Sequence, residues 1–271
     1  MTQSGIETGF ITINEAQVYY EITGEGQPLV LLHAGVADSH MWDEQFAVFA
    51  QQYRVVRYDL RGYGQSEVPA KAFRAHEELA QLLQQLKISS AHIVGISYGG
   101  KIALDFTLAH PEMVKKLVLV APSISGSLPA PEVLKFYEDE EAALEAEDLD
   151  GATELNLRMW VDGPKRVPSE VKSAVRERVR EMQRQAFDTI FPEGGIELDL
   201  EPPAVARLSE IKIPTLVIVG DYDIQPKLEQ ARWLATEITN AQHVVIAGVA
   251  HMVNMEKPAE FNVAVLDFLN Q

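Results

Sequence analysis

The sequence predicts an α/β fold class, with a mostly parallel sheet flanked by helices and interrupted by one helical insertion. Short apolar runs rich in β-branched residues alternate with stretches of helical periodicity. This alternation stops between Pro122 and Ile211, where no convincing strand pattern occurs. The chain has 271 residues, 46% of them hydrophobic, and a chain of this length buries roughly three quarters of its unfolded surface. A single large core is therefore expected.

The first third of the chain predicts strands and turns. Phe10 to Asn14 and Val18 to Ile22 form the arms of a predicted hairpin around Glu15-Ala16. A segment rich in Gly and Pro, residues 24–28, then breaks the chain. The apolar run Leu29 to Leu32 follows, and an uninterrupted run of this kind suits a strand that is buried on both faces of a parallel sheet.

Later elements follow the same two patterns. Continuous apolar runs predict further strands at Tyr53–Tyr58, Ala91–Ile96, Lys116–Val120, Pro214–Val219 and Val244–Ala247. Helical periodicity predicts helices at Ala75–Leu86, Gly100–Ala109, Lys227–Thr236 and Ala259–Leu269. Because strands and helices alternate, we expect a doubly wound sheet with right-handed crossovers.

The break in the alternation predicts an inserted helical cap. Helical patterns cover residues 134–149, 152–161 and 170–191, separated by Gly and Pro. We expect residues 1–124 and 208–271 to form the core and residues 125–207 to form the cap, or lid. An insertion at this point would cover the carboxyl ends of the strands, where open α/β sheets bind ligands.

Composition excludes several classes of function. The net charge of −17 argues against a nucleic acid or an anionic membrane as partner, since both attract basic surfaces. The chain has no cysteine, which excludes disulfides, thiolate metal sites and a cysteine nucleophile. Eight acidic residues without a basic one lie between Phe136 and Gly151, and we interpret them as a solvated face rather than a cation site.

No metal or other cofactor is expected, and the partner is predicted to be a small molecule. The N-terminal residues lack a signal-peptide pattern, and no apolar run reaches the roughly 18 residues of a membrane span. The expected location is therefore cytoplasmic. The sequence does not distinguish a monomer from a homodimer.

The segment Gly95 to Gly99 carries the first sign of chemistry. It has the pattern G-x-S-x-G and lies between a predicted strand and a predicted helix. A serine on such a sharp turn projects its hydroxyl away from the backbone, and the flanking glycines leave room for the turn. A bare match also fits a glycine-rich turn with a capping serine, so Ser97 needs catalytic partners elsewhere in the chain.

A serine nucleophile needs a base, because its hydroxyl stays protonated at neutral pH. His251 is the candidate, since it follows the last predicted strand and can reach the same sheet edge as Ser97. Ordinary structural hydrogen bonding or a loop position explains the other six of the seven histidines: His33, His40, His76, His92, His110 and His243.

The base in turn needs an acid that fixes its tautomer. Asp221 and Asp223 both lie in a loop directly after the predicted strand Pro214–Val219 and before His251. Spacing alone does not choose between them, and either could instead cap the helix that begins near Pro226.

The chain offers a nucleophile, an acid and a histidine in this order, each on a loop after its own strand. In this order of residues the sequence resembles the α/β-hydrolase fold superfamily, over essentially the whole chain. Three further segments carry the resemblance. His33-Ala34-Gly35 looks like the family's oxyanion loop, Asp59 to Ser66 matches its D-x-R-G-x-G-x-S segment, and Gly220 to Asp223 matches its acid loop. One departure is Ala34, where the family commonly has glycine.

The resemblance implies roles for single residues. The family usually uses the second aspartate of the acid loop, which selects Asp223 and keeps Asp221 in reserve. It also implies an oxyanion hole made by the backbone N–H groups of Gly35 and Tyr98. Together with Ser97 and His251, these residues imply two-step acyl transfer through an acyl-enzyme.

The reaction expected from this resemblance is hydrolysis of carboxylic esters of small apolar substrates. Ser97 lies at the sharp turn of the segment Gly95 to Gly99, which we call the elbow. A serine there argues against haloalkane dehalogenases and epoxide hydrolases, which use an aspartate at this position. A lactonase is the nearest alternative, a C–C bond hydrolase is third, and a non-catalytic ligand-binding protein on the same fold is the competing class. The substrate, an ester or a lactone, is expected to contact Met41, Trp42, Ile124, Trp160 and Met252. Met41-Trp42 and the segment 158–160 look somewhat like 3-oxoadipate enol-lactonases and small carboxylesterases.

Overall fold

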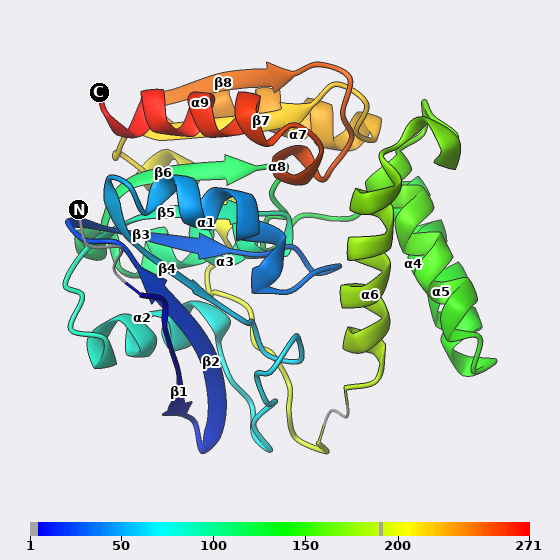
Figure 1. The fold of residues 1–271 in the computed structure, drawn as a ribbon, viewed down its shortest axis with the longest axis horizontal. Helices are drawn as coiled ribbons and strands as arrows, with labels where there is room; N and C mark the ends of the chain where they lie inside the picture. Colours follow the sequence, from blue (N-terminus) through cyan, green and yellow to red (C-terminus); the bar gives the residue numbers. More distant parts are fainter. Residues whose placement is uncertain (1–4, 190–191) are drawn as a thin grey trace.

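The computed structural model describes residues 5–189 and 192–271, and an eight-stranded sheet runs through it (Figure 1). The strand order is β1-β2-β4-β3-β5-β6-β7-β8. The strands are β1 (Glu7–Ile13), β2 (Ala16–Thr23), β3 (Gln27–Leu32), β4 (Tyr53–Tyr58), β5 (Ala91–Ile96), β6 (Val114–Val120), β7 (Thr215–Gly220) and β8 (Ala241–Ile246). The pairs β1–β2 and β2–β4 are antiparallel and the other neighbouring pairs are parallel, which confirms the predicted fold class.

The N-terminal hairpin turns one residue earlier than predicted. Asn14 and Glu15 occupy the turn between β1 and β2, both with positive φ (52° and 67°). Two positive φ values in a two-residue turn match the right-handed twist of the flanking strands. The prediction placed the turn on Ala16, which instead pairs with Ile13 as the first residue of β2.

Helices cover both faces of the sheet. α2 (Ala75–Gln85), α3 (Tyr98–Ala109) and α7 (Gln225–Glu237) pack in one hydrophobic cluster, and α1 (Asp43–Phe49) and α9 (Pro258–Leu269) pack in a second. Alternate residues of β3 enter the two clusters, Val30 the first and Leu31 the second. Because successive side chains of a strand point to opposite faces, the two clusters lie on opposite sides of the sheet.

A helical segment lies between β6 and β7 in the chain. It contains α4 (Pro131–Glu145), α5 (Leu149–Asn156), a π-helical turn (Leu157–Asp162) and α6 (Ser173–Phe187). Figure 1 shows α4, α5 and α6 beside the ends toward which β3, β6 and β8 point. α4 begins at Pro131, three residues before the predicted helix, because proline suits the first helical turn. The last residues of the third predicted helix, Ile190 and Phe191, lie outside the described residues.

Both ends of this segment are fixed beside α3. The hydroxyl of Ser125 donates to the carboxylate of Asp105 (2.6 Å) and accepts the N–H of Ala204 (2.9 Å). The carbonyl of Ser125 also accepts the N–H of Val205 (3.1 Å). The outgoing and returning chains therefore meet at one buried network, which we call the Asp105 junction.

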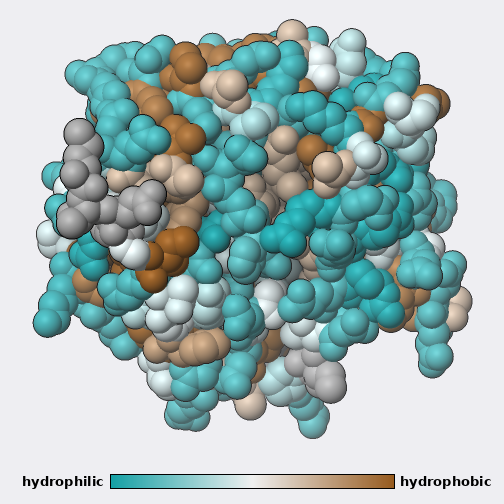
Figure 2. Space-filling model, in the orientation of Figure 1, coloured by the Kyte–Doolittle hydropathy of each residue, from teal (hydrophilic) through white to brown (hydrophobic). Residues whose placement is uncertain are grey.

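The face drawn in Figure 2 is largely hydrophilic, and apolar side chains lie on it in separate groups. Within the described ranges, no helix combines the length and apolar character that a bilayer crossing requires. The same residues contain no cluster of three or more His, Asp or Glu side chains that could hold a metal ion.

Candidate active site

Ser97 occupies a sharp turn between β5 and α3. Its φ is 54° and its ψ is −112°, an uncommon conformation for a residue other than glycine. Backbone hydrogen bonds hold this conformation: the N–H of Ser97 donates to Val120 (2.9 Å), and its carbonyl accepts from Ser123 (2.9 Å) and Lys101 (3.0 Å). A conformation of this kind persists only where surrounding structure fixes it, and such positions cluster at active sites.

Glycine is required at both glycine positions of the elbow, because a Cβ atom there would come too close to other backbone atoms. A Cβ atom on Gly95 would lie 2.3 Å from the carbonyl oxygen of Gly99, and one on Gly99 would lie 2.4 Å from that of Leu32. The N–H of Gly99 also donates to the carbonyl of His33 (3.0 Å), which ties the elbow to the loop after β3. The G-x-S-x-G pattern therefore reflects close approach of three backbone segments.

Asp223 and His251 form a buried pair. The Nδ1 atom of His251 lies 2.7 Å from Oδ2 of Asp223, and Oδ1 of Asp223 accepts the N–H of Ile224 (2.8 Å). Because an ionised carboxylate can only accept hydrogen bonds, Nδ1 carries the proton and Nε2 is the basic nitrogen. Nε2 has no hydrogen-bond partner among the described residues.

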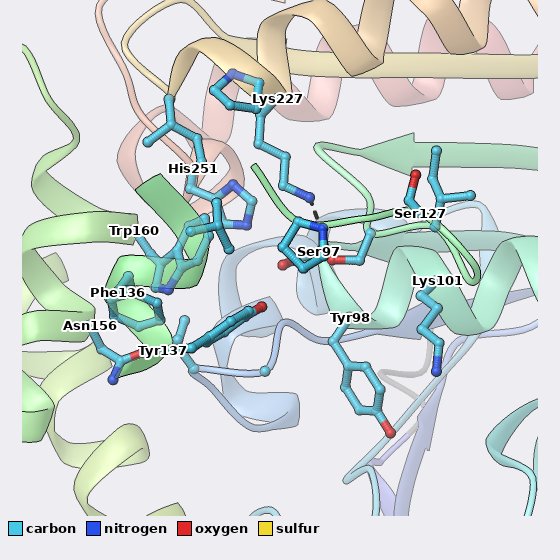
Figure 3. Close-up of a pocket in the computed structure, with 18 of the residues that line it drawn as sticks. Ser97, Tyr98, Lys101, Ser127, Phe136, Tyr137, Asn156, Trp160, Lys227 and His251 are labelled. Atoms are coloured by element: carbon cyan, nitrogen blue, oxygen red, sulfur yellow. Dashed lines mark hydrogen bonds between the residues drawn. The ribbon is translucent and has the colours of Figure 1, made fainter. Parts of the chain in front are cut away.

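His251 and Ser97 line the same cavity. Figure 3 shows the imidazole of His251 reaching down toward Ser97, with Trp160 beside it. The free nitrogen of His251 and the serine hydroxyl make no mutual hydrogen bond. Catalytic hydrogen bonds are often long before substrate binds, so this geometry is compatible with a base and its nucleophile.

The two aspartates of the acid loop have different partners. Asp221 accepts the N–H of Gly248 (2.5 Å) with Oδ1 and does not contact His251, whereas Asp223 does. Asp221 therefore joins the loop after β7 to the loop after β8, and Asp223 alone of the two orients the histidine. Spacing in the sequence left this choice open.

Two residues that line the cavity with Ser97 carry backbone N–H groups that are unpartnered among the described residues. Tyr98 is the first residue of α3, and Gly35 lies in the loop after β3; both line the cavity. Neither N–H donates to an acceptor within the described part of the chain. The N-terminus of α3 also places the positive end of the helix dipole at this point. Within the described residues, both donors are therefore available to an acceptor in the cavity.

The loop that carries Gly35 is held by His33. Its Nδ1 donates to the carbonyl of Ala34 (2.8 Å), and its Nε2 accepts the N–H of Leu60 (2.9 Å). Burial lowers the pKa of His33, so the neutral ring that these bonds require is favoured. The segment Asp59 to Ser66 thus supports the loop, and Asp59 also accepts the N–H of Ser39 (2.9 Å).

The cavity has a volume of about 890 Å³ and lies between the strand ends and the helical segment. The ring centroid of Trp160 is 4.9 Å from that of His251 and 5.5 Å from that of Phe136. Of the predicted substrate contacts, Trp160 and Ile124 line this cavity. A largely apolar pocket with a few polar groups is the usual form of a small-molecule site.

The other three predicted substrate contacts need correction. Met41, Trp42 and Met252 are buried in the hydrophobic cluster under α1 and α9 and do not line the cavity. The Sδ atom of Met41 accepts the N–H of Ala34 (3.3 Å), and the ring of Trp42 packs against Phe261 (6.0 Å). The short 3₁₀ helix Ser39–Trp42 directs these side chains into the core, which residue spacing could not show.

Sequence reasoning also missed polar residues of the cavity. Lys101, Lys227 and Glu197 line it, and Glu197 accepts hydrogen bonds from the hydroxyl of Tyr98 (2.5 Å) and from Lys101 (2.9 Å). Glu197 belongs to the chain returning from the helical segment. No local pattern marks it, because its partners are nearly a hundred residues away in the sequence.

Known proteins similar to this chain catalyse different reactions. A proline iminopeptidase of Lactobacillus helveticus is 28% identical over 94% of this chain and 95% of its own length. A 2-hydroxy-6-oxo-6-(2'-aminophenyl)hexa-2,4-dienoic acid hydrolase of Metapseudomonas resinovorans is 26% identical over 100% of this chain and 93% of its own. The crystal structure of the enol-lactonase from Burkholderia xenovorans LB400 aligns with a TM-score of 0.79 and 26% identity, covering 97% of this chain and 100% of that one.

These similarities extend over nearly the full length of the chain. In addition, residues 27–258 match the family model described as the alpha/beta hydrolase fold. The range begins with β3 and ends at the first residue of α9, so it includes Ser97, Asp223 and His251.

Proposed function

We propose that this chain, which belongs to the α/β-hydrolase fold family, is a serine hydrolase that cleaves carboxylic esters through an acyl-enzyme on Ser97. One observation carries the proposal. The buried hydrogen bond between Asp223 and His251 leaves Nε2 unpartnered in a cavity that it shares with Ser97. A neutral imidazole with a fixed tautomer and a free nitrogen is what a serine nucleophile requires.

In the first step, Nε2 of His251 removes the proton from the hydroxyl of Ser97 as Oγ attacks the ester carbonyl. Asp223 orients the ring and stabilises the imidazolium that forms. The N–H groups of Gly35 and Tyr98 donate to the developing oxyanion, and each such donor is worth about a hundred- to a thousandfold in rate. His251 then gives its proton to the leaving alkoxide, which departs as an alcohol.

In the second step, water attacks the acyl-enzyme and His251 removes its proton. The tetrahedral intermediate collapses, the carboxylic acid leaves, and the hydroxyl of Ser97 regains its proton from the histidine. The same oxyanion donors serve both steps, so no metal or cofactor enters this scheme.

The helical segment supplies one wall of the cavity in this proposal and acts as the cap. Phe136 and Trp160 from this segment face the side of the cavity that holds Ser97 and His251 (Figure 3). Residues 125–207 would then determine which substrates reach the nucleophile, while residues 1–124 and 208–271 provide the chemistry.

Lactone hydrolysis is the second candidate. It is favoured by the similarity to the enol-lactonase, which covers nearly both chains. A lactone is a cyclic ester, so the same attack on its carbonyl opens the ring, and the acid and alcohol groups remain on one molecule. C–C bond hydrolysis is a third candidate, supported by the Metapseudomonas resinovorans relative.

A substrate panel tests the proposal. We expect p-nitrophenyl esters of short and medium acyl chains to be hydrolysed with higher kcat/KM than lactones or a vinylogous diketone. Ser97→Ala should lower kcat by about 10⁴-fold or more while circular dichroism shows an unchanged fold. A folded Ser97→Ala variant with wild-type activity would refute the nucleophile. Faster opening of lactones or cleavage of the diketone would select the second or third candidate.

A further inference from the structure

Lys227 differs from the other cations that line the cavity. Arg61 pairs with Glu78 (2.9 Å), and Lys101 pairs with Glu197 (2.9 Å) and Asp199 (2.6 Å). Lys227 lines the same cavity but makes no ion pair within the described part of the chain. Among the described residues, no carboxylate therefore contacts the ammonium group of Lys227.

The partners of Lys227 are neutral oxygens. Its Nζ donates to the carbonyl of Pro122 (2.6 Å), and longer contacts reach the hydroxyl of Ser123 (3.4 Å) and the side-chain oxygen of Gln230 (3.3 Å). An ammonium group has three donors, and all three are engaged here, one in a short bond and two in long ones. An anion that enters the cavity can replace the two long bonds with a shorter, charge-assisted one.

The amine is placed close to the nucleophile. Pro122 precedes Ser123, and the N–H of Ser123 donates to the carbonyl of Ser97 (2.9 Å). Figure 3 shows the side chain of Lys227 reaching from α7 to the loop beside Ser97. An anion bound at Nζ would accordingly lie on the side of the cavity that holds Ser97.

The carboxylates around Lys227 compensate its charge only in part. Burial lowers its pKa to about 8, and the nearby charge of Asp223 only partly opposes this effect. Asp223 itself is engaged with His251. Of the glutamates that line the cavity, Glu197 is held by Tyr98 and Lys101, Glu140 by Asn156, and Glu229 by Gln225.

We propose that Lys227 binds a carboxylate of the substrate, so that the preferred substrates are esters or lactones that carry a free carboxylate near the scissile carbonyl. This inference rests on the proposed function and narrows its substrate class. Alternative cations are already engaged: Arg158 and Arg184 of the helical segment pair with Asp162 (2.6 Å) and Asp188 (2.8 Å). Neither arginine lines the cavity.

Matched substrates test this inference. The monoethyl esters of succinate, glutarate and adipate are compared with the same ethyl esters whose free carboxylate is replaced by a carboxamide. The two members of each pair have nearly the same shape and differ in charge. A charge-assisted hydrogen bond to Lys227 should raise kcat/KM of the anionic member by about ten- to a hundredfold for at least one chain length.

Three variants assign the preference to Lys227. Lys227→Met should bring the ratio of anionic to neutral kcat/KM close to one, and Lys227→Arg should retain a ratio above one. Lys116→Met is the matched control, since Lys116 also donates to backbone carbonyls, those of Phe268 and Leu269, but does not line the cavity. It should leave the ratio at the wild-type value.

The outcomes separate this inference from the proposed function. Hydrolysis of the neutral esters through Ser97 with no preference for the anionic partner at any chain length would overturn the role of Lys227 alone. A preference that survives in Lys227→Met would do the same. If wild-type protein hydrolyses no ester and Ser97 is not the reactive residue, the proposed function fails and the role of Lys227 fails with it.

Discussion

The core side of the cavity and the side formed by the helical segment are built by different interactions. On the core side, hydrogen bonds fix Ser97, Asp223 and His251 on loops that follow β5, β7 and β8. On the helical side, Phe136 and Trp160 are held mainly by ring packing. Hydrogen bonds fix direction and distance, whereas apolar packing tolerates exchange of side chains of similar volume.

This difference suggests a division of tasks. The proposed triad would have to keep its geometry, because a displacement of about 1 Å can cost a hundredfold in rate. A wall that selects substrates can change its side chains while the chemistry stays the same. The similar proteins include a proline iminopeptidase, a dienoic acid hydrolase and an enol-lactonase on chains of similar length, which agrees with this view.

The largest expected effect concerns the two aspartates of the acid loop. Asp223→Asn should lower kcat by about 10⁴-fold, because the amide no longer fixes the tautomer of His251. Asp221→Asn is the matched control on the same loop and should change kcat by less than about tenfold, since its amide oxygen can still accept the N–H of Gly248 and the residue does not contact His251. Steady-state kinetics on one ester decides between them. A larger loss in Asp221→Asn would make that residue the acid.

Two tryptophan substitutions, one in the cavity wall and one in the core, should have effects of intermediate size. Trp160→Leu should raise KM by about tenfold, because it removes part of the cavity wall beside His251. Trp42→Leu should instead lower the free energy of unfolding by about 2–4 kcal/mol and leave KM within about twofold, because Trp42 is fully buried in the core. Denaturant unfolding and kinetics measure both quantities. A KM change in Trp42→Leu as large as in Trp160→Leu would contradict the assignment.

The smallest effect is expected at the Asp105 junction, where core and helical segment meet. Burial raises the pKa of Asp105 to about 6, above its ordinary value of 3.8. The folded state therefore binds a proton more tightly than the unfolded state, and the ionised carboxylate reduces stability as pH rises through about 6. Asp105→Asn removes this penalty while its side-chain oxygen still accepts from Ser125.

Relative to wild type, Asp105→Asn should raise the free energy of unfolding by about 1–2 kcal/mol more at about pH 8 than at about pH 5. Urea unfolding of wild type and variant at the two pH values measures this difference. An effect that does not vary with pH would mean that Asp105 is not desolvated in the folded protein.

The sequence predicted the core well for identifiable reasons. β4 and β5 begin and end where predicted, because each is a continuous apolar run bounded by polar residues or by the elbow. β1 begins at Glu7, before the predicted Phe10, since an edge strand needs no continuous apolar pattern. α1 was not predicted, because its seven residues are too few for a clear helical period.

The candidate site was predicted in part. The resemblance to α/β-hydrolases, confirmed by the family match, drew on motifs whose residues are close in sequence. Spacing left Asp221 and Asp223 open, and only the resemblance selected Asp223. The burial of Met41 and Trp42 depends on three-dimensional packing, which spacing does not encode. Lys227 was not predicted to bind substrate, because its lack of a carboxylate partner becomes visible only when the chain is folded.

Covalent labelling tests the central claim, the nucleophilic role of Ser97, most directly. A fluorophosphonate forms a stable bond to a serine that a base activates and an oxyanion hole assists. Peptide mass mapping should find the phosphonyl adduct on Ser97 in the wild-type protein, with much slower labelling in Asp223→Asn and none at residue 97 in Ser97→Ala. An unmodified Ser97, or an adduct on another serine, would contradict the account.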